Sequence, residues 1–251
     1  MDTAKQAGRK PYEFSATESS VDTRLRPLLK AGAWSAMLFV VLVFIPLFLV
    51  SSTPVVPAGD GQAILEYIIA HPVSYIVQLV SFVGLSLPAL VVFAALGSAL
   101  FYHAPSTAIL GGLLGIASEI VALAVLSSPQ SLHAGLVVLA FDYMKADVII
   151  RPSLEAAALA LAANANTVTP AGIMTALAIF NLSLAMRRAG FPRALAVFGV
   201  VSGILGIFME ALRPFVGPAY IIYGLALPFW FFFVGLRLFK LAGQTSVSHL
   251  A

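Results

Sequence analysis

Six long apolar runs constrain the fold of this chain more than any other feature. They cover residues 31–50, 73–102, 107–126, 170–186, 193–212 and 218–239. At about 1.5 Å per helical residue, each run can cross most or all of a bilayer core about 30 Å thick. Hydrophobic residues make up 60% of the chain and charged residues 10%, against about 45–50% and 25% in soluble domains. The sequence therefore predicts an all-α polytopic bundle of six transmembrane helices.

The distribution of basic residues predicts the orientation of this bundle. With the N-terminus inside the cell, the inner set is Lys5, Arg9, Lys10, Arg24, Arg26, Lys30, Arg187, Arg188, Arg193, Arg237 and Lys240, and the outer set is Lys145, Arg151 and Arg213. Cytoplasmic loops of membrane proteins are enriched in Lys and Arg. We therefore expect a cell-membrane protein with both termini cytoplasmic, a flexible tail over residues 1–30 and a second tail over residues 241–251.

The interval between the third and fourth runs, residues 127–169, is too charged to cross a membrane. It contains Asp142, Lys145, Asp147, Arg151 and Glu155 within a short stretch. Asp142 and Lys145 stand three residues apart, and the pairs Asp147–Arg151 and Arg151–Glu155 four apart, which favours ion pairs on one helix face. We expect an extracytoplasmic helical segment that packs on the bundle, with a break at Pro152 and a second helix through Ala163.

Prolines and glycines predict local features of the spans. Pro88 lies near the middle of the long second run, where we expect a kink. Gly111 and Gly115 in the third run, and Gly199 and Gly203 in the fifth, have the small-x-x-x-small spacing of closely packed membrane helices. A short amphipathic helix is also expected in the loop of residues 51–72.

Polar side chains in the outer halves of the spans are the candidate ligand-binding or proton-coupling residues. They are Glu119, Glu210, Arg213, Gln78, Ser81, Tyr220 and Tyr223. An ionisable group inside a membrane is costly and needs a partner or water. A polar cavity opening outward beneath residues 127–169 would satisfy these groups together.

Each candidate also has a structural interpretation. Glu210 and Arg213 are three residues apart near a helix end, which favours an interfacial ion pair over a site. Tyr220 and Tyr223 fit an aromatic belt at the membrane surface. Glu119 is either a protonated structural residue or a functional one. In both cases it needs a donor, for which Arg213, Tyr220 and Gln78 are the candidates.

Several function classes find no support in the sequence. There is no cysteine, and the four histidines lie singly outside the apolar runs, so we expect no metal site and no haem. Nucleotide-binding and hydrolase motifs are absent from the sequence. The basic residues fit membrane topology, so we expect no nucleic-acid partner. No catalytic residue can be named, no cofactor is expected, and an enzyme is not favoured.

A family resemblance rests on the turn Arg188–Ala189–Gly190–Phe191–Pro192–Arg193 before the glycine-rich fifth run, and on Gly59–Asp60–Gly61 after the first run. With the six-run layout, these features resemble the bacterial membrane family catalogued as domain of unknown function 4386. The resemblance covers roughly residues 31–240. It implies a six-helix membrane fold and no established activity.

Two functional hypotheses follow. The first is a membrane protein that binds a lipid or a small apolar ligand, or that serves as an accessory subunit of a membrane complex. Its expected partners are membrane lipids, a small apolar ligand, and another membrane protein or a second copy of the chain. The alternative is a small proton-coupled transporter that uses Glu119. The sequence shows neither an inverted repeat nor matched broken helices, which many such transporters have.

Overall fold

The computed structural model describes residues 23–57, 59–125, 127–128 and 132–244, and nearly all of them are helical. A 3-10 turn, Thr23–Leu25, leads into the first helix. The helices are α1 (Arg26–Ser52), α2 (Gly61–Ala70), α3 (Pro72–Gly84), α4 (Ser86–Leu100), α5 (Pro105–Val125), α6 (Ala134–Lys145), α7 (Arg151–Ala165), α8 (Pro170–Met186), α9 (Arg193–Ala211), α10 (Arg213–Val216) and α11 (Tyr220–Gln244). Two short strands, β1 (Ser127–Ser128) and β2 (Leu132–His133), form an antiparallel ladder.

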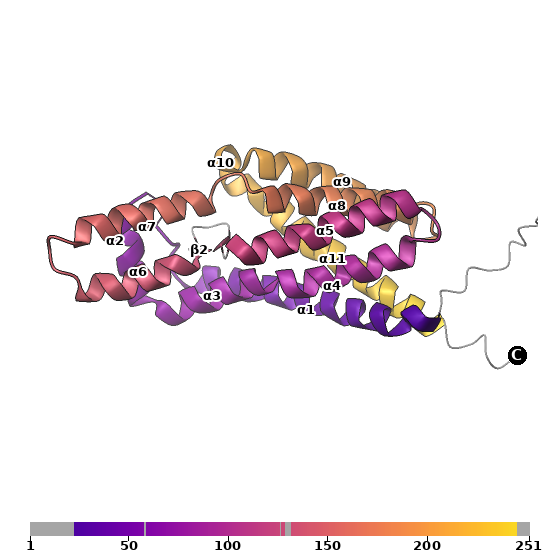
Figure 1. The fold of residues 1–251 in the computed structure, drawn as a ribbon, viewed down its shortest axis with the longest axis horizontal. Helices are drawn as coiled ribbons and strands as arrows, with labels where there is room; N and C mark the ends of the chain where they lie inside the picture. The colour runs from indigo at the N-terminus through magenta and orange to yellow at the C-terminus, as the bar shows by residue number, and fades with distance from the viewer. Residues whose placement is uncertain (1–22, 58, 126, 129–131, 245–251) are drawn as a thin grey trace, which may run out of the picture.

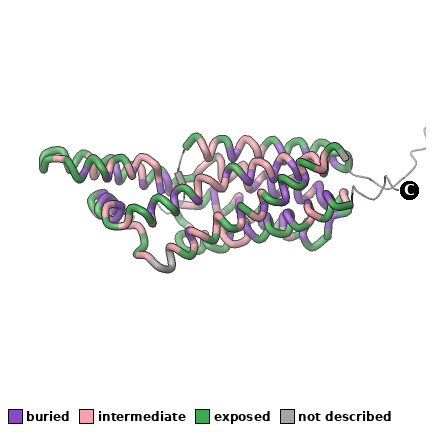
Figure 2. Tube along the Cα trace, turned by 90° about the horizontal axis from the view of Figure 1, so that it is seen from below, coloured by how far each residue is buried: buried purple, intermediate pink, exposed green. Residues whose placement is uncertain are grey.

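The long helices form one bundle, which confirms the predicted all-α class (Figure 1). Six helical segments are long and apolar enough to cross a membrane. In the bundle α5 packs on α8, α8 on α9, α1 on α11 and on α4, and α4 on α5. Buried positions lie along the inside of this bundle, whereas exposed positions face outward (Figure 2). Outward-facing side chains such as Trp34, Phe48 and Leu113 are large and apolar, as expected of a surface that contacts lipid.

The second span is divided into α3 and α4 at Leu85. Pro88 has no N–H to donate to the carbonyl of Gly84, and its ring would clash with that carbonyl in a continuous helix. The chain resolves this conflict by ending α3 at Gly84 and starting α4 at Ser86. The helix is thus interrupted three residues before Pro88, while Leu85 itself keeps right-handed helical backbone angles. A kink of the helix axis stays a prediction.

The helices α2, α6 and α7 form a second packed unit, here called the cap, at one end of the bundle (Figure 1). Its own hydrophobic core includes Ile64, Leu132, Leu136 and Ala158, together with Tyr75 from the first turn of α3. Residue 61 is glycine where α2 meets α7, and a Cβ there would overlap the carbonyl group of Glu155. Residues 127–169, which we expected to pack on the bundle, pack mainly on α2 and contact the bundle through α3.

The charged stretch within the cap differs from the prediction. α6 ends at Lys145 and α7 begins at Arg151, so residues 146–150 form a turn rather than part of a helix. The break precedes Pro152, which occupies the first turn of α7, where a missing N–H costs nothing. None of the three predicted pairs among Asp142, Lys145, Asp147, Arg151 and Glu155 forms an ion pair within the described part of the chain.

The predicted domain boundaries also shift at both ends. α1 begins at Arg26 rather than at residue 31, and α11 continues to Gln244 rather than ending near residue 240. Both terminal helices are therefore longer than the apolar runs that predicted them. The remaining parts of the expected tails, residues 1–22 and 245–251, lie outside the described residues.

Candidate functional site

Glu119 lies in the interior of the bundle, on the second-last turn of α5, with 7% of its surface exposed. The Ser118 hydroxyl is 3.4 Å from Glu119 Oε1. The Thr175 hydroxyl, on the facing helix α8, is also 3.4 Å from Oε1 and donates a 3.0 Å hydrogen bond to Ser118 Oγ. The Ser86 side chain at the start of α4 also lies near the carboxyl group. We call Ser86, Ser118, Glu119 and Thr175 the Glu119 cluster.

The partners of Glu119 differ from the predicted ones. Among the described residues, its hydrogen-bonding neighbours are hydroxyl groups, and Arg213, Tyr220 and Gln78 are not among them. The sequence contained one local signal for this arrangement, because Ser118 directly precedes Glu119. The partnership with Thr175 depends on how α8 is rotated against α5, which the sequence pattern does not reveal.

Glu210 and Arg213 form the predicted ion pair at the end of α9. Arg213 Nη2 is 2.8 Å from Glu210 Oε2, and the two side chains are 10% and 3% exposed. The Tyr220 hydroxyl donates a 2.6 Å hydrogen bond to Glu210 Oε1 and accepts a 2.9 Å bond from Arg213 Nη2. The Arg213 guanidinium also lies over the Tyr220 ring, 5.1 Å from its centroid. This closed set of contacts favours the structural interpretation of Glu210.

Tyr223 is buried, so its predicted place in an exposed aromatic belt is wrong. It is 2% exposed, and its ring lies against Gly206 of α9, where a Cβ would overlap it. Its ring centroid lies 6.0 Å from that of Tyr220, whose hydroxyl contacts Glu210 and Arg213. Tyr223 therefore packs beside the Glu210–Arg213 pair.

Gln78 and Ser81 are both buried on α3, but the structure does not show them as part of the same site. Gln78 Nε2 donates a 3.1 Å hydrogen bond to Ser74 Oγ on its own helix. None of the seven candidate residues lines either of two largely apolar pockets found in the described part of the protein. The polar contacts of Glu119 and of the Glu210–Arg213 pair are thus separate from these two pockets, and the polar cavity opening outward stays a prediction.

Within the charged segment, the structure pairs Glu155 with a residue that the sequence analysis did not select. The Tyr143 hydroxyl donates a 2.8 Å hydrogen bond to Glu155 Oε1, and Arg151 lies over the Tyr143 ring, 5.1 Å from its centroid. The hydrogen bond to Glu155 raises the pKa of Tyr143 above its ordinary value. Asp142, Lys145 and Asp147 are exposed. These contacts join α6 to α7 within the cap.

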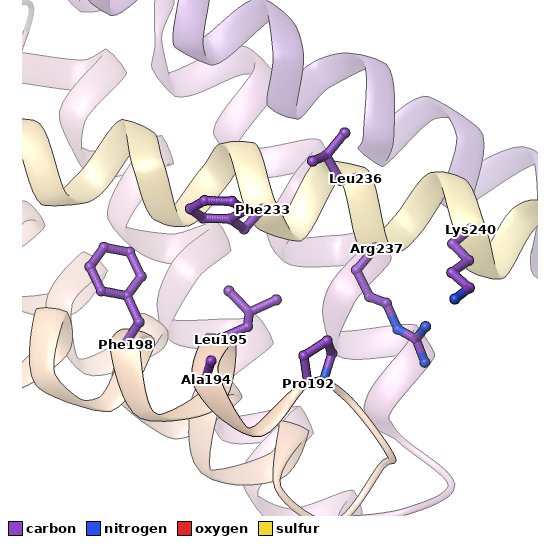
Figure 3. Close-up of a pocket in the computed structure, with 8 residues that line it drawn as sticks. All are labelled: Pro192, Ala194, Leu195, Phe198, Phe233, Leu236, Arg237 and Lys240. Atoms are coloured by element: carbon purple, nitrogen blue, oxygen red, sulfur yellow. The ribbon is translucent and has the colours of Figure 1, made fainter.

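A groove of about 440 Å³ lies between the start of α9 and the second half of α11. Its floor and walls are apolar, and Arg237 and Lys240 stand at one end. The lining residues are Pro192, Ala194, Leu195, Phe198, Phe233, Leu236, Arg237 and Lys240 (Figure 3). The sequence analysis placed Arg237 and Lys240 at the inner membrane boundary but did not identify this groove.

Within the described residues there is no cluster of three or more His, Asp or Glu side chains that could hold a metal ion. A comparison of the chain with protein families, curated proteins and solved structures finds no match. The structural findings therefore identify the chain as a multi-pass membrane protein of six apolar helical segments.

Proposed function

We propose that this protein is a non-enzymatic membrane protein that binds an anionic phospholipid in the groove between α9 and α11. The observation that carries the proposal is the combination of an apolar groove with a cationic end. The lining contains Leu195, Phe198 and Phe233, while Arg237 and Lys240 supply the only charged side chains among the lining residues. An acyl chain fits the apolar part, and a phosphate fits the cationic end.

The surroundings of Arg237 support a role in binding an anion. Its Nη2 donates a 3.2 Å hydrogen bond to the Gly190 carbonyl, and its guanidinium lies 5.4 Å from the centroid of the Phe191 ring. Among the described residues, no carboxylate forms an ion pair with Arg237 or Lys240, and Arg237 Nε has no hydrogen-bond partner. The positive charge at this end of the groove is therefore not neutralised within the described part of the protein.

The location of the groove also fits a lipid of the inner leaflet. Arg187 and Arg188 lie in the adjacent turn and Arg193 is the first residue of α9. Basic residues are enriched on the cytoplasmic side of membrane proteins. The inner leaflet carries the anionic lipids that attract such residues. We also propose that the protein lies in the cell membrane with both termini cytoplasmic, and that it belongs to the family that its sequence resembles.

Native mass spectrometry of the detergent-purified protein tests the proposal. We expect retention of phosphatidylglycerol in preference to phosphatidylcholine. Each basic residue near an anionic surface contributes about 1 kcal/mol, so Arg237→Gln with Lys240→Gln should weaken this retention roughly 30-fold. Lys30→Gln, which removes an exposed inner charge on α1, is the matched control.

A second pair of variants tests the apolar part of the groove. Ala194 is exposed and lines the groove, whereas Val197 is exposed on the same helix outside it. Ala194→Trp should displace the lipid, and Val197→Trp should leave it bound. Equal retention of both phospholipids, or equal loss in both tryptophan variants, would show that the groove has no specific lipid.

The alternative function, a proton-coupled transporter, depends on a different part of the protein. It rests on the burial of Glu119 between α5 and α8. That carboxyl group lies toward the other end of the bundle from the α9–α11 groove. Loss of lipid binding in the groove variants therefore would not test the role of Glu119.

A further inference from the structure

Helix α6 of the cap has two apolar sides, and the cap core covers one of them. Leu136 and Ala140 are buried in the core that α6 shares with α2 and α7. Val138, Phe141 and Met144 are exposed, and they lie on the other side of the helix because residues three or four apart share a helix face. This second side has no partner within the described part of the chain.

The exposed apolar surface continues into the turn between α6 and α7. Val148 and Ile149 are 81% and 92% exposed, and Ile150 is half exposed. The turn forms the end of the α6–α7 hairpin that lies farthest from the bundle (Figure 1). We call this surface the cap face, and it consists of Val138, Phe141, Met144, Val148, Ile149 and Ile150.

Charged side chains place the cap face in water rather than in lipid. Asp142 and Lys145 are exposed on α6 beside Phe141, and Asp147 and Arg151 stand directly before and after the apolar residues of the turn. None of these four forms an ion pair among the described residues, and unpaired charges are costly inside a membrane. In water, an exposed apolar patch marks a site of interaction with another protein.

We propose that the cap face binds the cap face of a second copy of this chain. Two copies in one membrane share the same orientation, so a closed dimer has its two-fold axis along the membrane normal. Helix α6 runs roughly along the length of the bundle (Figure 1). The two α6 helices therefore meet in parallel, and Phe141 packs against Phe141 of the second copy.

The charges beside the cap face fit a second copy of the chain. Asp142 and Lys145 are about one helical turn apart on α6. In the parallel arrangement, Asp142 of each copy lies within reach of Lys145 of the other, and the symmetry produces this pair twice. With Asp147 and Arg151, the surface carries two acidic and two basic side chains. Such a surface complements itself, whereas it attracts neither a strongly acidic nor a strongly basic partner.

The size of the cap face determines where the dimer should be measured. Full burial of one of these side chains removes about 60–120 Å² from water, so at the observed exposures the cap face offers roughly 200–450 Å² of apolar surface. Stable complexes of freely diffusing proteins bury about 800 Å² on each partner. Two copies in one membrane are already confined and aligned, which lowers the entropic cost of association. We therefore expect a dimer in membranes that dissociates on dilution in detergent.

Disulfide cross-linking of the full-length protein in membranes tests the contact, because the chain has no cysteine of its own. Phe141→Cys places one thiol near the two-fold axis, and Val138→Cys repeats the test with Phe141 intact. We expect mild oxidation to give a product of twice the monomer mass. Gln62→Cys, exposed on α2, is the matched control and should stay monomeric.

Three outcomes of this experiment would overturn the proposal. They are the absence of the dimer from both cap-face variants, an equal yield of dimer from Gln62→Cys, and a product of another mass, which would identify a different protein as the partner. Thermal unfolding midpoints of the three cysteine variants should agree, since all three positions are exposed.

A charge exchange in the Val138→Cys background separates specific contact from random collision. Asp142→Lys replaces attraction by repulsion in both symmetry-related pairs and should slow the cross-linking about tenfold. Adding Lys145→Asp should restore the rate, because the exchanged charges again face each other across the two copies. Cross-linking that is unchanged by Asp142→Lys, or that the double exchange does not restore, would contradict the proposed contact.

The lipid groove provides an independent control for the same measurement. Arg237→Gln with Lys240→Gln alters the groove between α9 and α11, and neither residue belongs to the cap. This double variant should cross-link through Val138→Cys at the normal rate. Dimerisation and lipid binding can therefore fail separately, and loss of cross-linking in the groove variant would show that the cap face is not sufficient for the dimer.

Discussion

The backbone of Gly172 on α8 lies directly against the carboxyl group of Glu210 on α9. A Cβ added at residue 172 would overlap the carboxyl atoms of Glu210. Glu210 is simultaneously held by Arg213 and by the Tyr220 hydroxyl. The close approach of α8 to α9 at this level therefore requires a residue without a side chain, and it confines the carboxylate to the position where both partners reach it.

We expect Gly172→Ala to destabilise the bundle. The added methyl group must displace either the Glu210 carboxylate or the start of α8, and such overpacking costs about 1–3 kcal/mol. The measurement is the thermal unfolding midpoint in detergent. Gly224→Ala on α11 is the control, because a Cβ there meets nothing within 4 Å. An unchanged midpoint in Gly172→Ala would contradict the close contact.

Removing one member of the Glu210–Arg213 pair should lower the free energy of unfolding more than removing both members. Glu210→Gln leaves a nearly buried guanidinium without its counter-charge, which we expect to lower the free energy of unfolding by about 3 kcal/mol. The double variant with Arg213→Gln should recover part of this loss. A double-mutant cycle measures the coupling, and strictly additive effects would argue against the pair. Glu155→Gln in the cap, where no ion pair forms among the described residues, serves as the control.

The cap should lose stability in mild acid through His133. Its Nδ1 accepts a 2.9 Å hydrogen bond from the Gly135 N–H and thereby caps α6. Burial lowers the pKa of His133 below its ordinary value, so the folded protein favours the neutral ring. The stabilisation is therefore complete above the unfolded pKa, about 6.5, and is lost as the pH falls below it toward the folded pKa.

Amide hydrogen exchange over residues 135–140, corrected for intrinsic rates, measures this effect. We expect α6 to exchange faster at acidic pH, with a loss of about 1 kcal/mol, the usual contribution of an N-cap. His133→Asn retains a capping acceptor without a titrating ring and should remove the pH dependence. His103→Asn, at an exposed turn, should keep it. A pH dependence that persists in His133→Asn would assign it to another group.

The predicted orientation can be tested with reporters in cells. A reporter fused after Ala251 and a tag inserted between residues 187 and 193 should both lie in the cytoplasm, because most basic residues were assigned to that side. A tag in the turn of residues 146–150 should be accessible from outside. Surface labelling of either inner position in intact cells would overturn this topology.

Contacts between residues close in the sequence could be predicted at the candidate site, whereas contacts between distant residues could not. The Glu210–Arg213 pair was predicted because residues three apart on a helix meet whatever the rest of the chain does. The same reasoning was wrong for Asp147 and Arg151, because a turn precedes Pro152 and separates the two helices. Tyr143 and Thr175 were missed, since their partners lie 12 and 56 residues away in the chain.

The sequence by itself determined the six membrane-compatible segments and the interruption near Pro88. These are local properties, because a helix in lipid must satisfy its own backbone hydrogen bonds over a fixed apolar length. Tertiary structure alone decided that Thr175 faces Glu119, that Tyr223 is buried against Gly206 and that α9 and α11 enclose a groove. Such contacts depend on the rotation and offset of whole helices, which many side chains set together and no short pattern encodes.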